Sequence, residues 1–286
     1  MRKFSSLISL TLLLVVNHVF ASNNNYPVGA RAAALGNASV TFTSVYSGFH
    51  NQAGLAYLEN IEFGFSYRNN FLLKQTGLKS GVLAIPIKKI GVVGLSVNSF
   101  GYNSYGEHKF GLAFAKQFGD VFSFGLQLDY LQTQFNDPYG SKGVVLGEFG
   151  VMGKLTKELT IAAHIFNPTR TYMDKETSDR VPTIIKAGLG YEFSEKLLTS
   201  IELEKDLDLP KPNFKAGIEY KPYKAIALRV GANSYPVKAS FGVGVYLNKL
   251  ALDVASEYHQ TLGFIPQFSL RYSIIRKKNN ADDTAN

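Results

Sequence analysis

The chain has 286 residues and a formal net charge of +8; 45% of its residues are hydrophobic and only 18% are charged. A mean hydropathy of −0.02 excludes a polytopic bundle of membrane-spanning helices, which requires repeated apolar runs of about 20 residues. The 13% aromatic content excludes a disordered chain, and the absence of cysteine excludes disulfides, thiolate metal sites and cysteine nucleophiles.

The first 21 residues have the three parts of a secretory signal peptide. Arg2 and Lys3 form a basic start, residues 7–16 form a short apolar core, and a small residue, Ala21, ends the segment. The core is too short to cross a membrane, so we expect export and cleavage after Ala21. Removal of the two basic residues leaves a formal charge of +6 on scattered lysines, which does not favour a nucleic-acid-binding face.

Residues 22–60 do not follow the pattern of the rest of the chain. The run from Ala32 to Leu35 favours a helical turn that Gly36 would end, and residues 47–58 favour a second short helix. The many small residues suit close packing inside another structure, so we interpret this segment as a plug that enters a lumen from the periplasmic side. A loose leader or an extra strand over residues 38–45 is the alternative.

Beyond residue 60, apolar and polar residues alternate, which is typical of strands with one apolar and one polar face. Residues 121–132, for example, place Phe124, Leu126 and Leu128 on one face and Gln127 and Asp129 on the other. The pattern predicts fourteen strands, which start near Ile61, Gly77, Ile90, Glu107, Val121, Gly143, Glu158, Pro182, Lys196, Lys211, Ala225, Val237, Lys249 and Ile265.

The connections between these strands differ in length from one to the next. Tight turns such as Lys88-Lys89 and Asn248-Lys249 alternate with connections that are mostly longer and more polar, such as residues 69–76 and 167–181. An up-and-down barrel of the outer membrane sorts its connections in this way, with short periplasmic turns and longer external loops.

Alternation alone does not say which face is inside, because a soluble sandwich has the same pattern turned inside out. Strands of about ten residues match a tilted membrane span, and fourteen strands exceed what a small filled soluble barrel uses. The polar face suits a wet or plugged lumen. We expect its charged residues to face that lumen: Glu62, Lys109, Asp129, Lys186, Glu202, Lys215, Glu219, Arg229, Asp253 and Arg271.

We therefore predict an all-β fold, a 14-stranded antiparallel up-and-down transmembrane β-barrel formed by residues 61–275 in the bacterial outer membrane. An N-terminal plug or hatch (22–60) precedes the barrel, and a polar tail (276–286) follows it. Because the chain has no tryptophan, tyrosine and phenylalanine must supply the interfacial girdles. The basic run Arg276-Lys277-Lys278 is interpreted as a stop at the headgroup boundary.

The plug segment carries a resemblance. Residues 29–38 (GARAAALGNA), followed by residues 51–56 (NQAGLA), resemble the N-terminal signature of the FadL-like outer-membrane proteins, and most of all the PorV/PorQ family of Bacteroidetes. The resemblance implies a fourteen-stranded barrel with an N-terminal hatch, although Gln52 stands where the family usually has proline. The hatch motif residues are Gly29, Arg31, Gly36, Asn51, Ala53, Gly54 and Leu55.

Two functions follow from this resemblance. We favour a non-enzymatic accessory or scaffold subunit of PorV/PorQ type, linked to type IX protein secretion or cell-surface attachment, with other secretion-system subunits or exported cargo as partners. A compact chain with short external loops favours this hypothesis. The alternative is a FadL-like channel for uptake of a hydrophobic small molecule, for which the candidate loop residues are Phe71, Leu72, Leu73, Phe264 and Ile265.

An enzyme is the least favoured hypothesis. His164 lies on the polar face of a strand, where a lone histidine is more often a hydrogen-bonded filler than a catalytic base. Glu202, Glu204, Asp253 and Glu257 are expected to pair with luminal lysine and arginine rather than to act as acid and base. We predict no catalytic, cofactor-binding or metal-ligating residues, and no nucleic-acid partner.

Overall fold

The computed structural model describes residues 25–136, 140–174 and 179–274. The predicted signal peptide (1–21) and the polar tail (276–286), with its basic run, lie outside the described residues.

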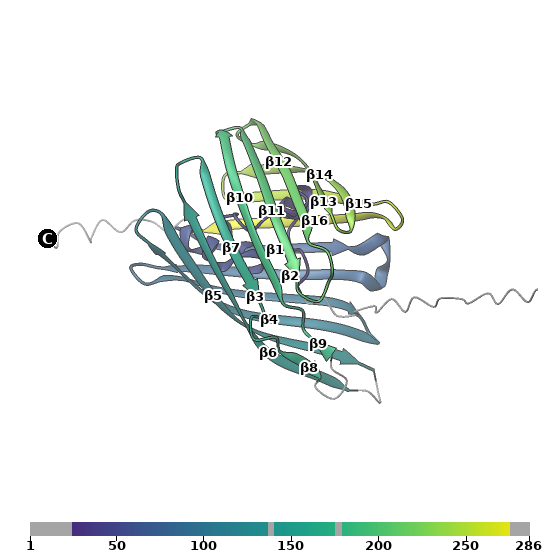
Figure 1. Ribbon diagram of the computed structural model, residues 1–286. Coiled ribbons are helices and arrows are strands. Elements are labelled where there is room, and N and C mark those ends of the chain that lie inside the picture. The colour runs from purple at the N-terminus through teal and green to yellow at the C-terminus, as the bar shows by residue number, and fades with distance from the viewer. Residues whose placement is uncertain (1–24, 137–139, 175–178, 275–286) are drawn as a thin grey trace, which may run out of the picture.

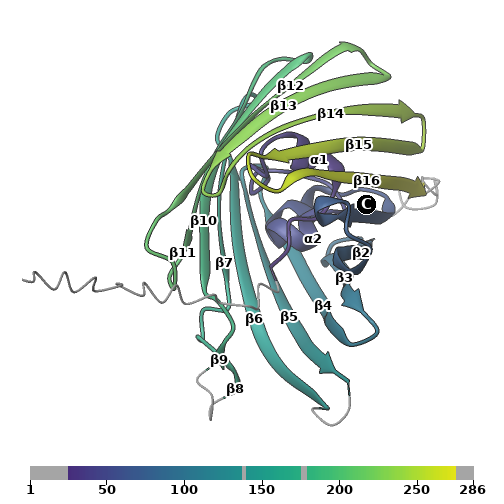
Figure 2. The same cartoon turned by 90° about the vertical axis from the view of Figure 1, so that its right-hand side faces the viewer.

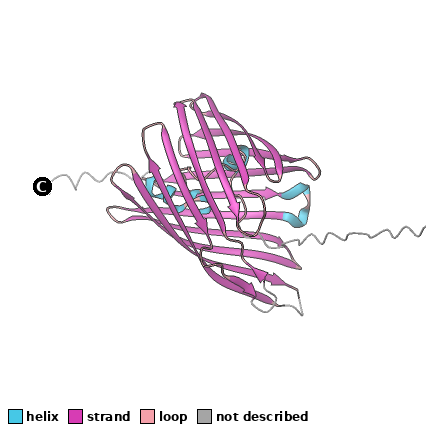
Figure 3. Cartoon of the chain, in the orientation of Figure 1, coloured by secondary structure: helices cyan, strands magenta, loops and turns pink. Residues whose placement is uncertain are grey.

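Fourteen of the described strands close into one antiparallel barrel, which confirms the predicted fold class (Figures 1 and 3). Neighbouring strands of the ring follow one another along the chain, and β1 pairs with β16 to close it. The barrel strands are β1 (Ile61–Asn69), β2 (Gly77–Ile87), β3 (Gly91–Tyr102), β4 (Tyr105–Phe118), β5 (Phe122–Phe135), β6 (Ser141–Lys154), β7 (Leu159–Phe166), β10 (Ile184–Ser194), β11 (Leu197–Asp206), β12 (Asn213–Tyr223), β13 (Ile226–Ser234), β14 (Val237–Leu247), β15 (Leu250–His259) and β16 (Gly263–Ile274).

A small second sheet interrupts the order between β7 and β10. It consists of β8 (Tyr172–Asp174) and β9 (Asp179–Arg180), which the sequence pattern did not predict because both strands are too short to alternate. Asn167 ties the start of this connection to the barrel, since its backbone N–H donates to the Gly147 carbonyl at 3.0 Å.

The apolar face of the wall points outward. On β5, the exposed fractions of Leu126, Leu128 and Tyr130 are 49%, 63% and 43%, whereas those of Gln127 and Asp129 are 3% and 1%. The same alternation continues around the ring, for example at Phe63 and Phe65 on β1. A soluble protein buries such residues, so this surface is the hydrocarbon-facing wall of a transmembrane barrel.

The two ends of the barrel differ in their connections. At one end the strands are joined by two to four residues, namely 88–90, 119–121, 155–158, 195–196, 224–225 and 248–249. At the other end the connections reach seven residues at 70–76 and seventeen at 167–183. Two connections at this second end have only two residues. The one at 235–236 is short as expected, and the one at 103–104 is shorter than expected because β3 and β4 continue further. We refer to these as the short-turn end and the long-connection end.

The helices of the N-terminal segment lie inside the ring. They are α1 (Ala30–Ala34), α2 (Ser47–His50) and the 3-10 helix η1 (Gln52–Tyr57), and Figure 2 shows α1 and α2 enclosed by the strands. Helix α1 contacts β13 to β16, and η1 contacts β3 to β6. Two further 3-10 turns, η2 (Asn70–Leu72) and η3 (Lys74–Thr76), belong to the connection between β1 and β2. In the described ranges, none of the helices has the length and apolar character required to cross a membrane.

Candidate functional site

Residues 25–60 cross the lumen from one end to the other. Tyr26 and Pro27 line the same hollow as Phe71 and Leu262 at the long-connection end, whereas Leu58 lines a hollow with residues 86–92 at the short-turn end. The segment therefore reaches both ends of the barrel, and its entry from the periplasmic side stays a prediction.

Small residues on both surfaces let α1 lie directly on the inner wall. A Cβ added to Gly231 would lie 2.2 Å from the Gly36 nitrogen, and one added to Gly217 would lie 2.6 Å from Leu35. Gly36 itself has a φ of +66°, and an added Cβ there would lie 2.4 Å from the Ala232 carbonyl oxygen. No side chain larger than hydrogen fits between these two backbones, so the glycines set the distance between α1 and the strands.

Polar side chains of the barrel wall form hydrogen bonds with the backbone and the side chains of the first half of the N-terminal segment. Arg31 donates from Nε and Nη2 to the two carboxylate oxygens of Glu219, at 2.9 and 3.0 Å. The backbone N–H groups of Ser39 and Val40 both donate to Glu202 Oε2 at 2.8 Å. Further bonds join Ala30 N–H to Ser269, Gly36 N–H to Ser240 and the Asn37 amide to Glu257.

The second half is fixed around Asn51, which breaks the single helix expected over residues 47–58 into α2 and η1. Asn51 has an extended backbone, and its side-chain oxygen accepts from the Ala53 N–H at 3.1 Å, so it caps η1. Its amide donates to the Val40 and Val151 carbonyls. Ala53 and Leu55 are fully buried, and a Cβ on Gly54 would lie 2.2 Å from the Phe42 carbonyl oxygen.

The structure places the hatch motif and the charged strand residues in one packed interior. Of the ten charged residues, Arg271 is only partly buried, and it lies 3.5 Å from Glu62. The others are at most 7% exposed, and each takes part in an ion pair. These include Lys109–Asp129 at 3.3 Å, Lys186–Glu204 at 3.7 Å, Lys215–Glu202 at 2.9 Å, Arg229–Glu219 at 2.6 Å and Arg229–Asp253 at 2.6 Å.

A buried cluster that the sequence did not single out surrounds Glu148 on β6. Its carboxylate accepts from Lys109 Nζ at 2.5 Å and from Gln52 Nε2 at 2.7 Å, and it lies 2.9 Å from His164 Nε2. The alternation along β6 could have placed Glu148 on the inner face of the wall. Its partners, however, come from three other elements, and the pairing register that brings them together cannot be read from the sequence of one strand. His164 is fully enclosed here as a hydrogen-bonded residue.

A vestibule of about 410 Å³ lies above the N-terminal segment at the long-connection end. Asn37, Ser39 and His50 of the segment contribute to its lining, together with inward residues of β1 and β10 to β16. The apolar part of the lining includes Phe71, Leu209, Leu262 and Ile265. The charged part includes four cations, Arg68, Lys186, Lys215 and Lys238, and two acids, Glu204 and Asp206.

Polar atoms in this vestibule differ in how fully they are bonded. Arg68 is 7% exposed, and its Nη2 lies 3.3 Å from Glu257, yet Nη1 has no hydrogen-bond partner among the described residues. His50 Nε2 lies 2.9 Å from the Val28 carbonyl oxygen. Burial, with a smaller effect from the Lys186 charge, lowers the pKa of His50 to about 3, so this ring is neutral at physiological pH.

The five candidate loop residues for a hydrophobic ligand separate in the structure. Phe71 and Ile265 line the vestibule. Leu72 and Leu73 are 66% and 52% exposed, and Phe264 is 49% exposed on the outer face, where its ring lies 5.1 Å from that of Tyr258. Alternation distinguishes the neighbours Phe264 and Ile265, because adjacent strand residues point to opposite faces.

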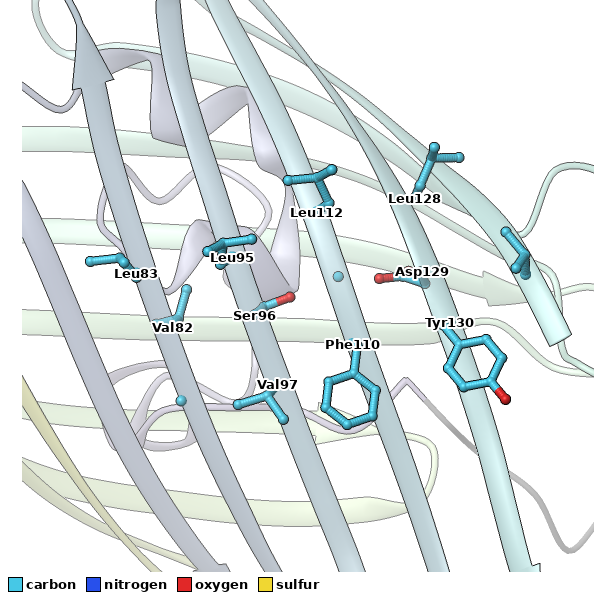
Figure 4. Close-up of a pocket in the computed structure, with 13 residues that line it drawn as sticks. Val82, Leu83, Leu95, Ser96, Val97, Phe110, Leu112, Leu128, Asp129 and Tyr130 are labelled. Carbon is cyan, nitrogen blue, oxygen red and sulfur yellow. The ribbon is translucent and has the colours of Figure 1, made fainter. Parts of the chain in front are cut away.

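A second hollow, of about 650 Å³, lies on the outer wall across β2 to β6 (Figure 4). Leu95, Leu112 and Leu128 line it on the lipid side, and the inward residues Ser96 and Asp129 lie at its floor. The hydrogen-bonded pairing of β3 with β4 and of β4 with β5 continues across this region. The hollow is therefore a depression in a closed wall that faces hydrocarbon.

Among residues 25–136, 140–174 and 179–274, no group of three or more histidine, aspartate or glutamate side chains has the spacing of a metal site. No protein-family model matches the chain, and no curated protein matches its sequence.

Several solved structures share the fold. The toluene transporter TbuX of Ralstonia pickettii has a TM-score of 0.65 at 12% identity, and the match covers 88% of this chain and 100% of that one. The toluene transporter TodX of Pseudomonas putida has a TM-score of 0.65 at 11% identity, covering 86% and 97%. A FadL homologue of Pseudomonas aeruginosa has a TM-score of 0.59 at 12% identity, covering 86% and 98%. At these identities the similarity is one of fold.

Proposed function

We propose that this protein is a non-enzymatic channel of the bacterial outer membrane that takes up small molecules with an apolar part, and that residues 25–60 are its hatch. The observation that carries the proposal is the vestibule against the N-terminal segment. Its volume of about 410 Å³ is in the range of small-molecule sites. The fold shared with TbuX and TodX, which are toluene transporters, supports the same function.

The lining of the vestibule suits a molecule with both an apolar and a polar part. Phe71, Leu262 and Ile265 offer apolar contact, while Arg68 Nη1 offers a hydrogen-bond donor without a partner in the described chain. A donor that is already desolvated strengthens binding when a ligand acceptor reaches it. This combination distinguishes the site from a purely apolar pocket for a hydrocarbon.

Passage beyond the vestibule requires the hatch to move. The floor is held by the two backbone bonds to Glu202 and by the Asn37–Glu257 bond, all between buried groups. Since these bonds close the route along the lumen, we expect the resting state to be closed and transport to involve displacement of residues 37–50.

Uptake assays test the channel function. In a strain without the gene, we expect uptake of radiolabelled toluene or oleate to fall several-fold and to return with the wild-type gene. Leu262→Asp places a charge at the mouth of the vestibule and is expected to lower uptake. Leu155→Asp changes a leucine of similar exposure in a short turn (47% against 53% for Leu262); it is the matched control and should restore uptake. Unchanged uptake of both probes in the deletion strain would contradict the proposal.

A binding subunit of a secretion system, of the PorV/PorQ type, is the second candidate. It is favoured by the dense bonding between the N-terminal segment and the wall, which leaves the lumen closed. Comparison of the proteins secreted by the same deletion strain distinguishes the two functions. Lost secretion with unchanged uptake would favour the scaffold, and lost uptake with unchanged secretion would favour the channel.

A further inference from the structure

A ring of lysines surrounds the short-turn end of the barrel. Five of the six short connections contain at least one lysine, and Lys116 lies three residues before the sixth, 119–121. One lysine from each of these five connections, together with Lys116 near the end of β4, defines the set that we call the lysine rim: Lys89, Lys116, Lys157, Lys196, Lys224 and Lys249. Since the connections follow the whole circumference, the rim does too.

The rim lysines are available to a partner. Lys116 is partly buried and the other five are exposed. Among the described residues, none of the six ammonium groups forms an ion pair, although the Lys116 Nζ lies 5.9 Å from the centre of the Phe118 ring. These cations therefore differ from the luminal ones, which are paired and buried.

Each rim lysine has a large exposed apolar residue within three positions. These neighbours are Ile90, Phe118, Leu155, Phe193, Tyr223 and Leu247, with exposed fractions from 47% for Leu155 to 71% for Tyr223. Such residues at the ends of membrane strands lie where hydrocarbon meets the headgroups. Five of the lysines lie just beyond these neighbours and Lys116 lies two residues before Phe118, so their flexible stems can reach the headgroup phosphates across the boundary.

The excess of positive charge is found at the short-turn end alone. The six short connections contain six lysines against three acidic residues. The connections at the opposite end, with β8 and β9 included, contain five basic and five acidic residues. A general excess of lysine would appear at both ends, so the asymmetry points to a partner at the short-turn end.

We propose that the lysine rim binds the phosphate groups of anionic phospholipids, such as phosphatidylglycerol, in the leaflet at the short-turn end. A protein partner would contact one side of the barrel and would require its charges there. A lipid leaflet surrounds the barrel and can therefore meet all six connections. Clusters of lysine next to a membrane attract anionic lipids in this way.

Lipid selectivity can be measured directly on the purified mature protein in phosphatidylcholine vesicles. The mobility of a trace of spin-labelled phosphatidylglycerol or phosphatidylcholine reports how strongly each lipid associates with the barrel. We expect phosphatidylglycerol to associate about threefold or more over phosphatidylcholine at low salt. The preference should approach one in about 1 M salt, where charges are screened within about 3 Å.

Three variants separate charge from folding. Lys→Gln at all six rim positions should abolish the preference, and Lys→Arg at the same positions should retain it. The matched control replaces Lys74, Lys79 and Lys211 near the long-connection end by glutamine and should leave the preference unchanged. Folding of each variant is verified by its β-sheet circular dichroism.

Two results would overturn the proposal. One is an unchanged preference in the folded Lys→Gln rim variant. The other is equal association of the two lipids with the wild-type protein, which would leave an acidic protein as the partner of the rim.

Discussion

The amide of Gln52, at the start of η1, donates a hydrogen bond of 2.7 Å to the carboxylate of Glu148 on β6. Both side chains are buried, at 0% and 2% exposure, so this bond links the N-terminal segment to the wall without access to water. Gln52 stands where the signature that residues 51–56 resemble usually has proline. The first position of a helix tolerates proline, so the backbone allows either residue, and the bond to Glu148 explains glutamine.

This relationship predicts the effect of changing Gln52. Gln52→Ala removes one donor from a buried carboxylate and should lower the free energy of unfolding by about 1–3 kcal/mol. Gln52→Glu places a second carboxylate beside Glu148 and should destabilise the protein more. Unfolding by urea of the protein refolded in vesicles measures both. Equal stability of Gln52→Glu and the wild-type protein would contradict the hydrogen bond between Gln52 and Glu148.

Arg31 should control how firmly α1 is held. Arg31→Ala removes the bidentate contact but leaves Glu219 paired with Arg229 and Lys221, so the free energy of unfolding should fall by about 1.5–3 kcal/mol. We expect this variant to show larger or more frequent openings in planar bilayers than the wild-type protein. Arg31→Lys keeps the charge but loses the forked geometry, so it should lie between the two. Identical conductance of all three proteins would show that the contact does not close the lumen.

Gly231 should tolerate no side chain. A Cβ at this position would overlap the Gly36 nitrogen at 2.2 Å, so Gly231→Ala must push α1 away from β13. We expect faster proteolysis of the N-terminal segment in the folded barrel. Gly147→Ala is the matched control, because the nearest atom to its added Cβ is 3.8 Å away. Equal protease resistance of the two variants would contradict the close packing.

Because His50 is buried, we expect the stability of the protein to depend on pH. In the folded protein its pKa is lowered to about 3, mainly by burial, whereas an unfolded histidine titrates near pH 6.5. Between these values the unfolded chain binds the extra proton, so stability is complete above about pH 6.5 and is lost as the pH falls toward 3. The loss per pH unit should reach about 1.4 kcal/mol.

The variant His50→Gln keeps a donor for the Val28 carbonyl and cannot take up a proton. The difference in unfolding free energy between this variant and the wild-type protein should therefore change with pH across that window. A constant difference from pH 7 to pH 4 would show that His50 does not titrate as described.

The barrel could be predicted from the sequence because lipid and lumen impose a period of two on every strand. All fourteen strand starts were predicted within two residues, including Ile61, Gly77 and Val237, which agree with the structure. Phe264 and Ile265 were instead grouped as loop residues, although the phase of the pattern would have placed them on opposite faces, as the structure does. Local alternation was sufficient for these features, since each depends on the residues of one strand.

The interior could not be predicted to the same depth. The bond between Gln52 and Glu148, and the ion pair of Arg229 with Asp253 across the intervening strand β14, depend on register around the ring. The helix expected over residues 47–58 is broken because Asn51 caps η1 through its own side chain. Such features arise from contacts between elements distant in sequence, which residue periodicity does not contain.

The central claim, that the apolar face meets lipid while residues 25–60 fill the lumen, has a direct test. The chain has no tryptophan, so a single introduced one reports its own surroundings. Leu128→Trp lies on the outer wall and Phe49→Trp lies in the N-terminal segment, with parent side chains 63% and 3% exposed. In vesicles of brominated phosphatidylcholine, we predict strong quenching of the tryptophan at 128 and little at 49. Equal quenching at the two positions, or stronger quenching at 49, would contradict the account.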